Sequence, residues 1–539
     1  MMQVIRLATT ASIVVGTQAM AQDVATQTST LQRMMFYRSF VQDDPACRLV
    51  VEDGVPTFTG EMAALAPAFC PDAYAWADLA TIVSKSFWNW GTDQTVWPDE
   101  PLPLCTTEGA VPCCDPDAAI DPAAPSLQCP VYRADYDPVP PLPAKPAALP
   151  NGSVINHRGL SRLESLDPGR LLRDIELEIV FRDKAMVDYL YRHDLYTREG
   201  LGARNRAQNA ALDRGDIGAA HGFEVRLPVG ATMVKGDFLH QDIMQARGLI
   251  RTVDNAGLPL DPPNHPEHPY LTVRIDGTGA EGEVPGLYYL VAMTNASRVL
   301  PVWHWYVVEH VANQGRCDYI GCNDSFGFSV PGGGQAGADY GPGYIPPHIT
   351  ANDVRQENNE TLFDIGLTYP PEETGEIRTP ALTALFAGMG IGTAEVDGDP
   401  DRITADDPAW LSYRMKGTQT AFTTAGGVPT GMGATVTEGG FVNSASCVTC
   451  HAEASVDAGG AAGMQGVGAT WRPNLMGYNQ VRMGAPDPGA FYTNDGPKVT
   501  ATQIDFIWGI LGASCARPTP DGEGCESYPD APTIVRAPD

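Results

Sequence analysis

The sequence predicts an α+β protein with an antiparallel β-rich central domain, flanking helices and a C-terminal domain that is mostly α-helical. Two different apolar periods carry this prediction. Between Asp167 and Leu195 apolar residues recur every three or four positions, as on one face of a helix. From Phe223 to Val311 they alternate with a period of two, as in half-buried strands. A chain of 539 residues is long enough for roughly three domains.

The first residues have the pattern of a secretory signal peptide. Arg6 supplies the positive charge, Leu7 to Val15 form a short apolar core, and Ala19 to Ala21 form a small-residue cleavage site. We therefore expect residues 1–21 to be removed near Ala21 and the mature protein to be periplasmic or secreted. No later apolar run approaches the roughly 18 residues that a membrane helix needs, so no membrane insertion is expected.

Residues 22–151 form a predicted N-terminal region rich in cysteine and proline. A helix is expected from Asp72 to Trp90, and the proline-rich run from Asp137 to Pro150 reads as a polyproline-like linker. That linker sets the boundary with the central domain, which we place at residues 152–378.

The central domain is predicted to begin with the Asp167-to-Leu195 helix. Its expected strands are Phe223 to Leu227, Tyr270 to Ile275, Gly286 to Met293 and Val302 to Val311. Alternation in the last strand places its side chains on two faces. Trp303, Trp305, Val307 and Glu309 share one face, and His304, Tyr306, Val308 and His310 share the other. The histidines could line a pocket, or they could simply be hydrogen-bonded within the sheet.

Residues 379–539 form the predicted C-terminal domain. Thr379 and Pro380 are a capping residue and a first-turn proline, which predict a helix over ALTALFAGMG. A second helix is expected from Thr500 to Leu511, with an apolar stripe made of Ile504, Ile507, Trp508 and Leu511.

Between these two helices lies Cys447-Val448-Thr449-Cys450-His451, a CxxCH motif. Cysteines three positions apart lie on one helical turn, so both sulfurs can reach the vinyl groups on one edge of a porphyrin, with the histidine under the iron. A thioredoxin-like redox pair would need a preceding strand, and the glycine-rich approach gives no strand signal. A zinc site would need two further ligands at short spacing, and none follows.

The remaining cysteines fit an oxidising compartment. The chain has 12 cysteines, and Cys447 and Cys450 leave an even ten for disulfides. Pairing is expected within local groups, although sequence does not give the connectivity. The groups are Cys47 with Cys70; Cys105, Cys113, Cys114 and Cys129; Cys317 with Cys322; and Cys515 with Cys525.

The chain carries a formal charge of −30, with a pI near 4.6. This acidity argues against nucleic-acid binding, because the phosphate backbone requires a basic surface. It fits either solubility outside the cytoplasm or steering towards a positively charged redox partner protein.

Three stretches together resemble a group of exported bacterial proteins described as cytochrome c family proteins. These are WHWYVVEHVANQGRCDY, the Tyr413-to-Gln419 stretch and EGGFVNSASCVTCH. The resemblance implies a divergent cytochrome c-like haem domain with one haem c, joined covalently to Cys447 and Cys450, and His451 as the proximal iron ligand. The amphipathic helix that normally ends in CxxCH is missing, and the resemblance supplies no reaction.

The distal iron ligand separates the possible functions, because a capped iron suits electron transfer and an open one binds small molecules. Met483 is the first candidate, followed by an open or unassignable position, by Met464 or Met476, and by His304 or His310. We expect a periplasmic monohaem cytochrome acting in electron transfer. The alternatives are a haem peroxidase or oxygenase with a pocket between the β-domain and the haem, and a ligand-binding redox sensor.

Overall fold

A computed structural model describes a large part of the chain. The described residues are 45–105, 112–118, 128–136, 176–246, 248–275, 285–310, 380–396, 398–423, 430–434, 437–438, 445–463, 484–486, 491–492, 498–522 and 524–526. The predicted signal peptide, residues 1–21, and the proline-rich run at 137–150 lie outside them.

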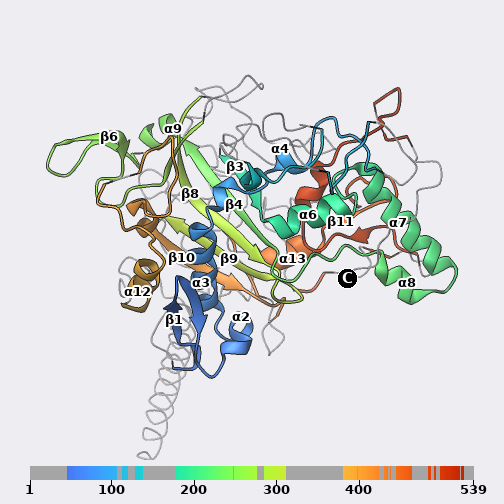
Figure 1. Cartoon of the computed structure of the whole chain (residues 1–539), viewed down its shortest axis with the longest axis horizontal. Helices are drawn as coiled ribbons and strands as arrows, with labels where there is room; N and C mark the ends of the chain where they lie inside the picture. The colour runs from blue at the N-terminus through green and yellow to red at the C-terminus, as the bar shows by residue number, and fades with distance from the viewer. Residues whose placement is uncertain are drawn as a thin grey trace, which may run out of the picture.

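The described elements are short helices and strands (Figure 1). The α-helices are α2 (Ala66–Phe69), α3 (Pro71–Ser84), α4 (Asp93–Val96), α6 (Lys184–Arg192), α7 (Arg198–Asp213), α8 (Ile217–Gly222), α9 (Gln241–Ala246), α12 (Pro380–Gly388) and α13 (Cys447–Ala452). The 3-10 helices are η1 (Pro45–Cys47), η2 (Ala63–Leu65), η3 (Phe87–Asn89), η4 (Arg133–Asp135), η7 (Pro408–Ser412) and η10 (Trp508–Gly512). The strands are β1 (Leu49–Glu52), β2 (Val55–Phe58), β3 (Leu177–Arg182), β4 (Thr232–His240), β5 (Arg251–Val253), β6 (Pro259–Asn264), β7 (Thr272–Ile275), β8 (Gly286–Ser297), β9 (His304–His310), β10 (Tyr413–Gln419), β11 (Ser455–Val456) and β12 (Thr502–Gln503).

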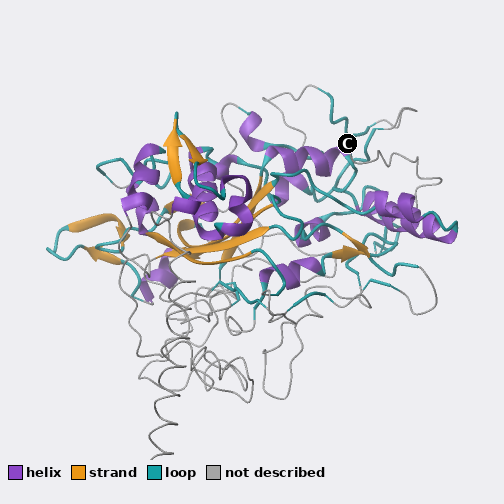
Figure 2. Cartoon of the chain, turned by 90° about the horizontal axis from the view of Figure 1, so that it is seen from below, coloured by secondary structure: helices purple, strands orange, loops and turns teal. Residues whose placement is uncertain are grey.

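A mixed α+β fold is confirmed, built on a six-stranded antiparallel sheet. Its order is β10-β9-β8-β4-β3, and β7 pairs with one end of β8. The long strand β8 runs through the middle and pairs with β4, β7 and β9. Figure 2 shows the sheet as a curved layer with helices packed over it and the β5–β6 hairpin projecting to one side.

Both faces of this sheet are buried, so it separates two apolar cores. Tyr306 and Val308 of β9 belong to the core beneath α3, which packs on β9 and β10. Trp305 and Val307 belong to the opposite core, which also contains Cys447. The alternation predicted for β9 is therefore confirmed, and each side of the strand serves a different core.

Three predicted elements differ in the structure. The segment from Asp167 to Leu195 is not one helix, because its described part is strand β3 followed by α6. Asp183 is the N-cap of α6, and its side chain accepts a hydrogen bond from Met186 N at 2.9 Å. The predicted strand from Phe223 to Leu227 is irregular. The predicted helix from Thr500 to Leu511 is strand β12 followed by the 3-10 helix η10.

The C-terminal region is not mostly helical over its described residues. Helix α12 is present as expected, but β10, β11 and β12 are strands, and α13 has six residues. Strand β10 pairs antiparallel with β9, with Gln419 opposite Trp305. The region that carries the CxxCH motif thus contributes a strand to the central sheet.

The predicted local disulfides are confirmed where the structure describes them. Cys47 is bonded to Cys70, Cys105 to Cys113, Cys114 to Cys129 and Cys515 to Cys525. Cys317 and Cys322 lie outside the described residues. Among the helices described, none combines the length and the apolar character needed to cross a membrane.

Candidate functional site

The CxxCH motif forms α13, whose first turn is held by the sheet. Ser446 is the N-cap, and its side chain accepts a hydrogen bond from Thr449 N. Gln419, at the end of β10, accepts from Val448 N at 3.0 Å through Oε1 and donates to Ser446 Oγ at 2.9 Å through Nε2. Gln419 therefore provides hydrogen bonds to the first turn of α13 and fixes its orientation.

Cys447 and Cys450 of the motif are the two described cysteines that are not in a disulfide. Cys447 is buried, and its Sγ lies 3.5 Å from Met432 O. Burial, and to a lesser degree the Glu438 carboxylate, hold the pKa of the Cys447 thiol well above its ordinary value. Reactive dithiol centres instead stabilise a thiolate at an exposed helix start. Cys447 therefore does not have the environment of a redox-active nucleophile.

His451 is oriented by a backbone carbonyl. Its Nδ1 lies 2.7 Å from Phe506 O, and because a carbonyl only accepts, Nδ1 carries the proton. Burial lowers the pKa of His451 to about 4 against the opposing effect of this hydrogen bond, so the ring is neutral at physiological pH. The Nε2 lone pair is then available, which is the arrangement of a metal-ligating histidine.

The carbonyl that orients His451 belongs to a strained turn. Asp505 and Phe506 have φ angles of 49° and 68°, in the left-handed region that non-glycine residues rarely adopt. The Asp505 carboxylate accepts hydrogen bonds from Leu227 N at 2.6 Å, Arg298 Nε at 2.8 Å and Trp303 Nε1 at 3.1 Å. These three donors hold the turn that presents the Phe506 carbonyl to His451.

Trp305 of β9 packs next to His451 of the motif. Its ring centroid lies 4.4 Å from that of His451, and Trp508 Nε1 donates a hydrogen bond to Cys450 O at 3.0 Å. Two tryptophans from distant segments of the chain therefore contact α13. The apolar stripe that predicted a terminal helix does contact the motif, although it is not α-helical.

The strand histidines do not approach the motif, which corrects one of the distal-ligand alternatives. His304 Nε2 bonds Pro71 O and His310 Nε2 bonds His268 O, both at 3.0 Å. Tyr306 donates to Asp78 at 2.8 Å. All three lie on the face of β9 opposite Trp305, so the interpretation that they are hydrogen-bonded within the fold is the correct one.

The predicted distal ligand Met483 lies outside the described residues, as do Met464 and Met476. Gly484, the residue after Met483, accepts a hydrogen bond from Thr449 Oγ1 at 2.7 Å. Residues 484–486 are therefore held against α13.

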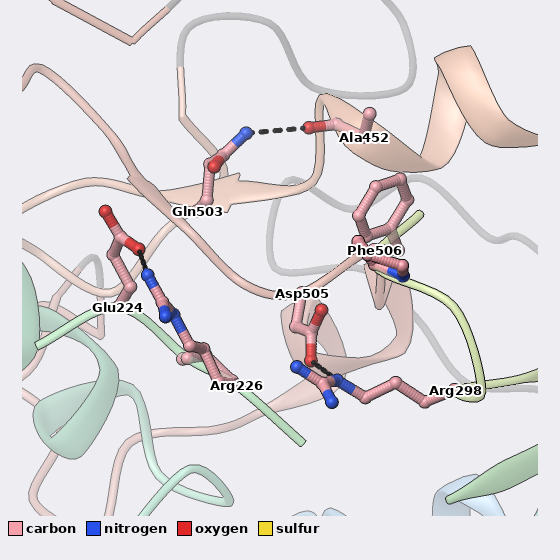
Figure 3. A pocket seen from close by; sticks show the side chains of 9 residues that line it. Glu224, Arg226, Arg298, Ala452, Gln503, Asp505 and Phe506 are labelled. Carbon is pink, nitrogen blue, oxygen red and sulfur yellow. Dashed lines mark hydrogen bonds and ion pairs between the residues drawn. The ribbon is translucent and has the colours of Figure 1, made fainter. Parts of the chain in front are cut away.

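A cavity of about 270 Å³ opens beside the strained turn (Figure 3). Arg226, Arg298, Gln503 and Phe506 are among its lining residues. Both guanidinium groups are paired, Arg226 with Glu224 at 2.7 Å and Arg298 with Asp505 at 2.8 Å. The motif residues Cys447, Cys450 and His451 do not line this cavity, so we do not assign it to a cofactor.

Comparison with protein-family models, curated proteins and solved structures finds no match to this chain. The candidate site is therefore defined by its own geometry.

Sequence reasoning found the three motif residues but missed the groups that hold them. Gln419 lies in a stretch singled out only by resemblance, and Asp505 lay inside a predicted helix. The one local signal for Trp305 was strand alternation, which placed it opposite the histidines.

Proposed function

We propose that the chain is an exported monohaem c-type cytochrome that acts in electron transfer. The observation that carries this proposal is the His451 ring, which is neutral, with Nδ1 held by Phe506 O at 2.7 Å. A bound haem would supply an iron that cycles between the ferric and ferrous states.

The residues present fit this cofactor. Cys447 and Cys450 lie on one turn of α13 and are not in a disulfide, although the eight other described cysteines are. They would hold the porphyrin edge through thioether bonds, and His451 would ligate iron through Nε2. Trp305 packs against the imidazole, with ring centroids 4.4 Å apart.

The competing dithiol interpretation accounts less well for the site. A redox-active cysteine pair needs a stabilised, accessible thiolate. Cys447 is buried, and its pKa is raised mainly by that burial. Covalent attachment makes this burial useful, because a thioether carries no charge.

The test is covalent haem in the full chain after export in a host that matures c-type cytochromes. Wild-type protein should keep haem stain through denaturing electrophoresis, and Cys447→Ala with Cys450→Ala should lose it. Cys105→Ser with Cys113→Ser removes one disulfide and should keep the stain. Stain that survives in the first double variant would show that the assignment is wrong.

Carbon monoxide separates electron transfer from oxygen or peroxide chemistry. A capped iron in the reduced protein should leave the optical spectrum unchanged on addition of carbon monoxide. Rapid binding would contradict electron transfer by a closed site and favour the peroxidase or oxygenase alternative.

A further inference from the structure

A second group of chemically unusual side chains lies on the same face of the sheet as Trp305. Glu176 precedes β3, Glu178 lies in β3 and Asp237 lies opposite it in β4. One carboxylate oxygen of each lies within 4.8 Å of the others. The three residues are 2%, 5% and 0% exposed, so these acids are inside the protein.

Two carboxylates in this cluster have oxygens without a partner. Among the described part of the chain, Glu176 Oε2 and Asp237 Oδ1 are buried and accept no hydrogen bond. The other Asp237 oxygen accepts from Thr437 Oγ1 at 3.0 Å. Buried carboxylate oxygens are normally hydrogen-bonded or bound to a cation.

A neutral oxygen lies on the same face. Thr294 of β8 is 7% exposed, its Oγ1 has no hydrogen-bond partner among the residues that the structure describes, and strand register places it directly opposite Lys235. It offers a hydroxyl oxygen on the same face as the carboxylates, two residues along the ladder from Asp237, and oxygen atoms of these types are the ligands of hard divalent cations.

The local charge also fits a divalent cation. Lys235 Nζ lies 3.2 Å from Glu178 Oε2 and supplies one positive charge. Three carboxylates and one ammonium leave two negative charges, and the neighbouring Glu438 carboxylate adds a third, so one divalent cation offsets most of this charge. The other groups that act on the cluster are Glu438, whose carboxylate accepts from Ala434 N at 2.6 Å, and the Arg182–Asp93 ion pair, joined at 2.6 Å.

We propose that Glu176, Glu178 and Asp237 form a binding site for a hard divalent cation such as Ca²⁺. Oxygen ligands on opposite sides of Ca²⁺ are separated by roughly 5 Å, twice the Ca–O distance, so oxygens within 4.8 Å of one another can share one ion. The haem motif contributes none of these three ligands, although Glu438 and Lys235 act electrostatically on both the cluster and Cys447.

Without a cation the cluster is electrostatically unfavourable. Burial is the largest cause that raises the pKa of Glu176 and Asp237 well above the ordinary carboxyl value, and burial also raises that of Glu178 against the effect of Lys235. Three carboxylic acids that keep their protons are therefore the competing state, and the experiment must distinguish it from a bound cation.

The test measures bound metal and its effect on stability in the full chain at pH 8. Protein treated with EDTA and then equilibrated with Ca²⁺ should hold one Ca²⁺ per chain by elemental analysis, and its Tm should rise on Ca²⁺ addition. Asp237→Asn and, as a second variant, Glu176→Gln should bind Ca²⁺ on the order of tenfold or more weakly. Asp188→Asn removes an acid that is 46% exposed and should keep both properties.

Three results would overturn the proposal. The first is a wild-type Tm that EDTA, Ca²⁺, Mg²⁺ and Mn²⁺ leave unchanged, with no bound metal. The second is full Ca²⁺ binding in both cluster variants, which would place the metal elsewhere. The third is a higher Tm in Asp237→Asn than in Ca²⁺-loaded wild type, as expected for protonated acids. The Cys447→Ala and Cys450→Ala double variant should still bind Ca²⁺. A failure of the haem proposal can therefore be distinguished from a failure of the cation proposal.

Discussion

Replacing Asp505 by alanine should destabilise the protein and disturb His451 together. The Asp505 side chain is 8% exposed and accepts hydrogen bonds from Leu227 N, Arg298 Nε and Trp303 Nε1. Removing it leaves two buried neutral donors and a guanidinium group without their acceptor. It also releases a turn whose φ angles of 49° and 68° are unfavourable by themselves.

The magnitude follows from two estimates. A hydrogen bond to a charged group contributes about 1.5–3 kcal/mol, so three such bonds give a gross upper range of about 4.5–9 kcal/mol. Arg298 is 19% exposed and regains water in the variant, which reduces that sum. Removing one partner of a buried ion pair costs about 3–5 kcal/mol, and we expect Asp505→Ala to lower the free energy of unfolding by about this amount.

Urea denaturation followed by tryptophan fluorescence measures this loss, as a lower midpoint with an unchanged slope. Arg298→Gln is the matched control. Its loss should be smaller, because Leu227 N and Trp303 Nε1 keep their acceptor and still solvate the Asp505 carboxylate, and the glutamine amide can donate in place of the guanidinium group. If the chain binds haem as proposed, the optical spectrum of the haem should also change in Asp505→Ala, since the Phe506 carbonyl is no longer fixed against His451. A stability change within about 0.5 kcal/mol, the usual range for surface substitutions, would refute the reasoning.

Two further predictions test other parts of the structure. Burial raises the pKa of Asp194 to about 7 from an ordinary value of 3.8, so the folded chain binds this proton more tightly than the unfolded chain. The stability that this group contributes is therefore full below about pH 4 and is lost as pH rises through about 7. Asp194→Asn should flatten that part of the profile of Tm against pH, and its Tm should exceed that of wild type at pH 8. Asparagine tolerates the φ of 53° at this position. An unchanged profile would contradict this assignment. Gln419→Leu leaves the buried Val448 N–H without its acceptor and should lower the free energy of unfolding by about 1–3 kcal/mol in urea denaturation, whereas no loss would show that α13 starts without this contact.

Sequence patterns predicted the centre of the sheet well. Strand β8 is a long, mostly apolar run, and the alternation in β9 places Trp305 in one core and Tyr306 in the other. Helices α3 and α12 have strong local start signals, with Pro71 and Pro380 at or near their first positions. Local patterning and burial agree in these elements, so sequence alone was sufficient.

The elements that were predicted wrongly are those whose apolar residues fit both the period of a strand and the period of a helix. Leu177, Ile179 and Phe181 alternate as a strand, but neighbouring apolar residues also fit a helical spacing, and only the pairing with β4 decides between them. That error hid Glu178 and therefore the acidic cluster, which exists because β3 and β4 are neighbours.

The helix predicted from Thr500 to Leu511 was wrong for a related reason. Ile504, Ile507, Trp508 and Leu511 are all buried as predicted, because successive turns and a 3-10 helix also bring residues three or four apart to one side. The segment from Phe223 to Leu227 has a strand-like pattern but pairs with no strand in the described part of the chain. Its backbone contacts Gln503, whose carbonyl accepts a hydrogen bond from Val225 N at 3.3 Å.

The position of β10 limits how this protein can be divided. A chain cut between His310 and Pro380 would leave the edge of β9 without its partner strand, and exposed strand edges promote aggregation. The fragment that kept CxxCH would lose Trp305 from beside His451, and Asp505 would lose Leu227, Arg298 and Trp303. The motif is therefore not a transferable cassette. Engineering or evolution that moves it to another protein must move the central sheet with it.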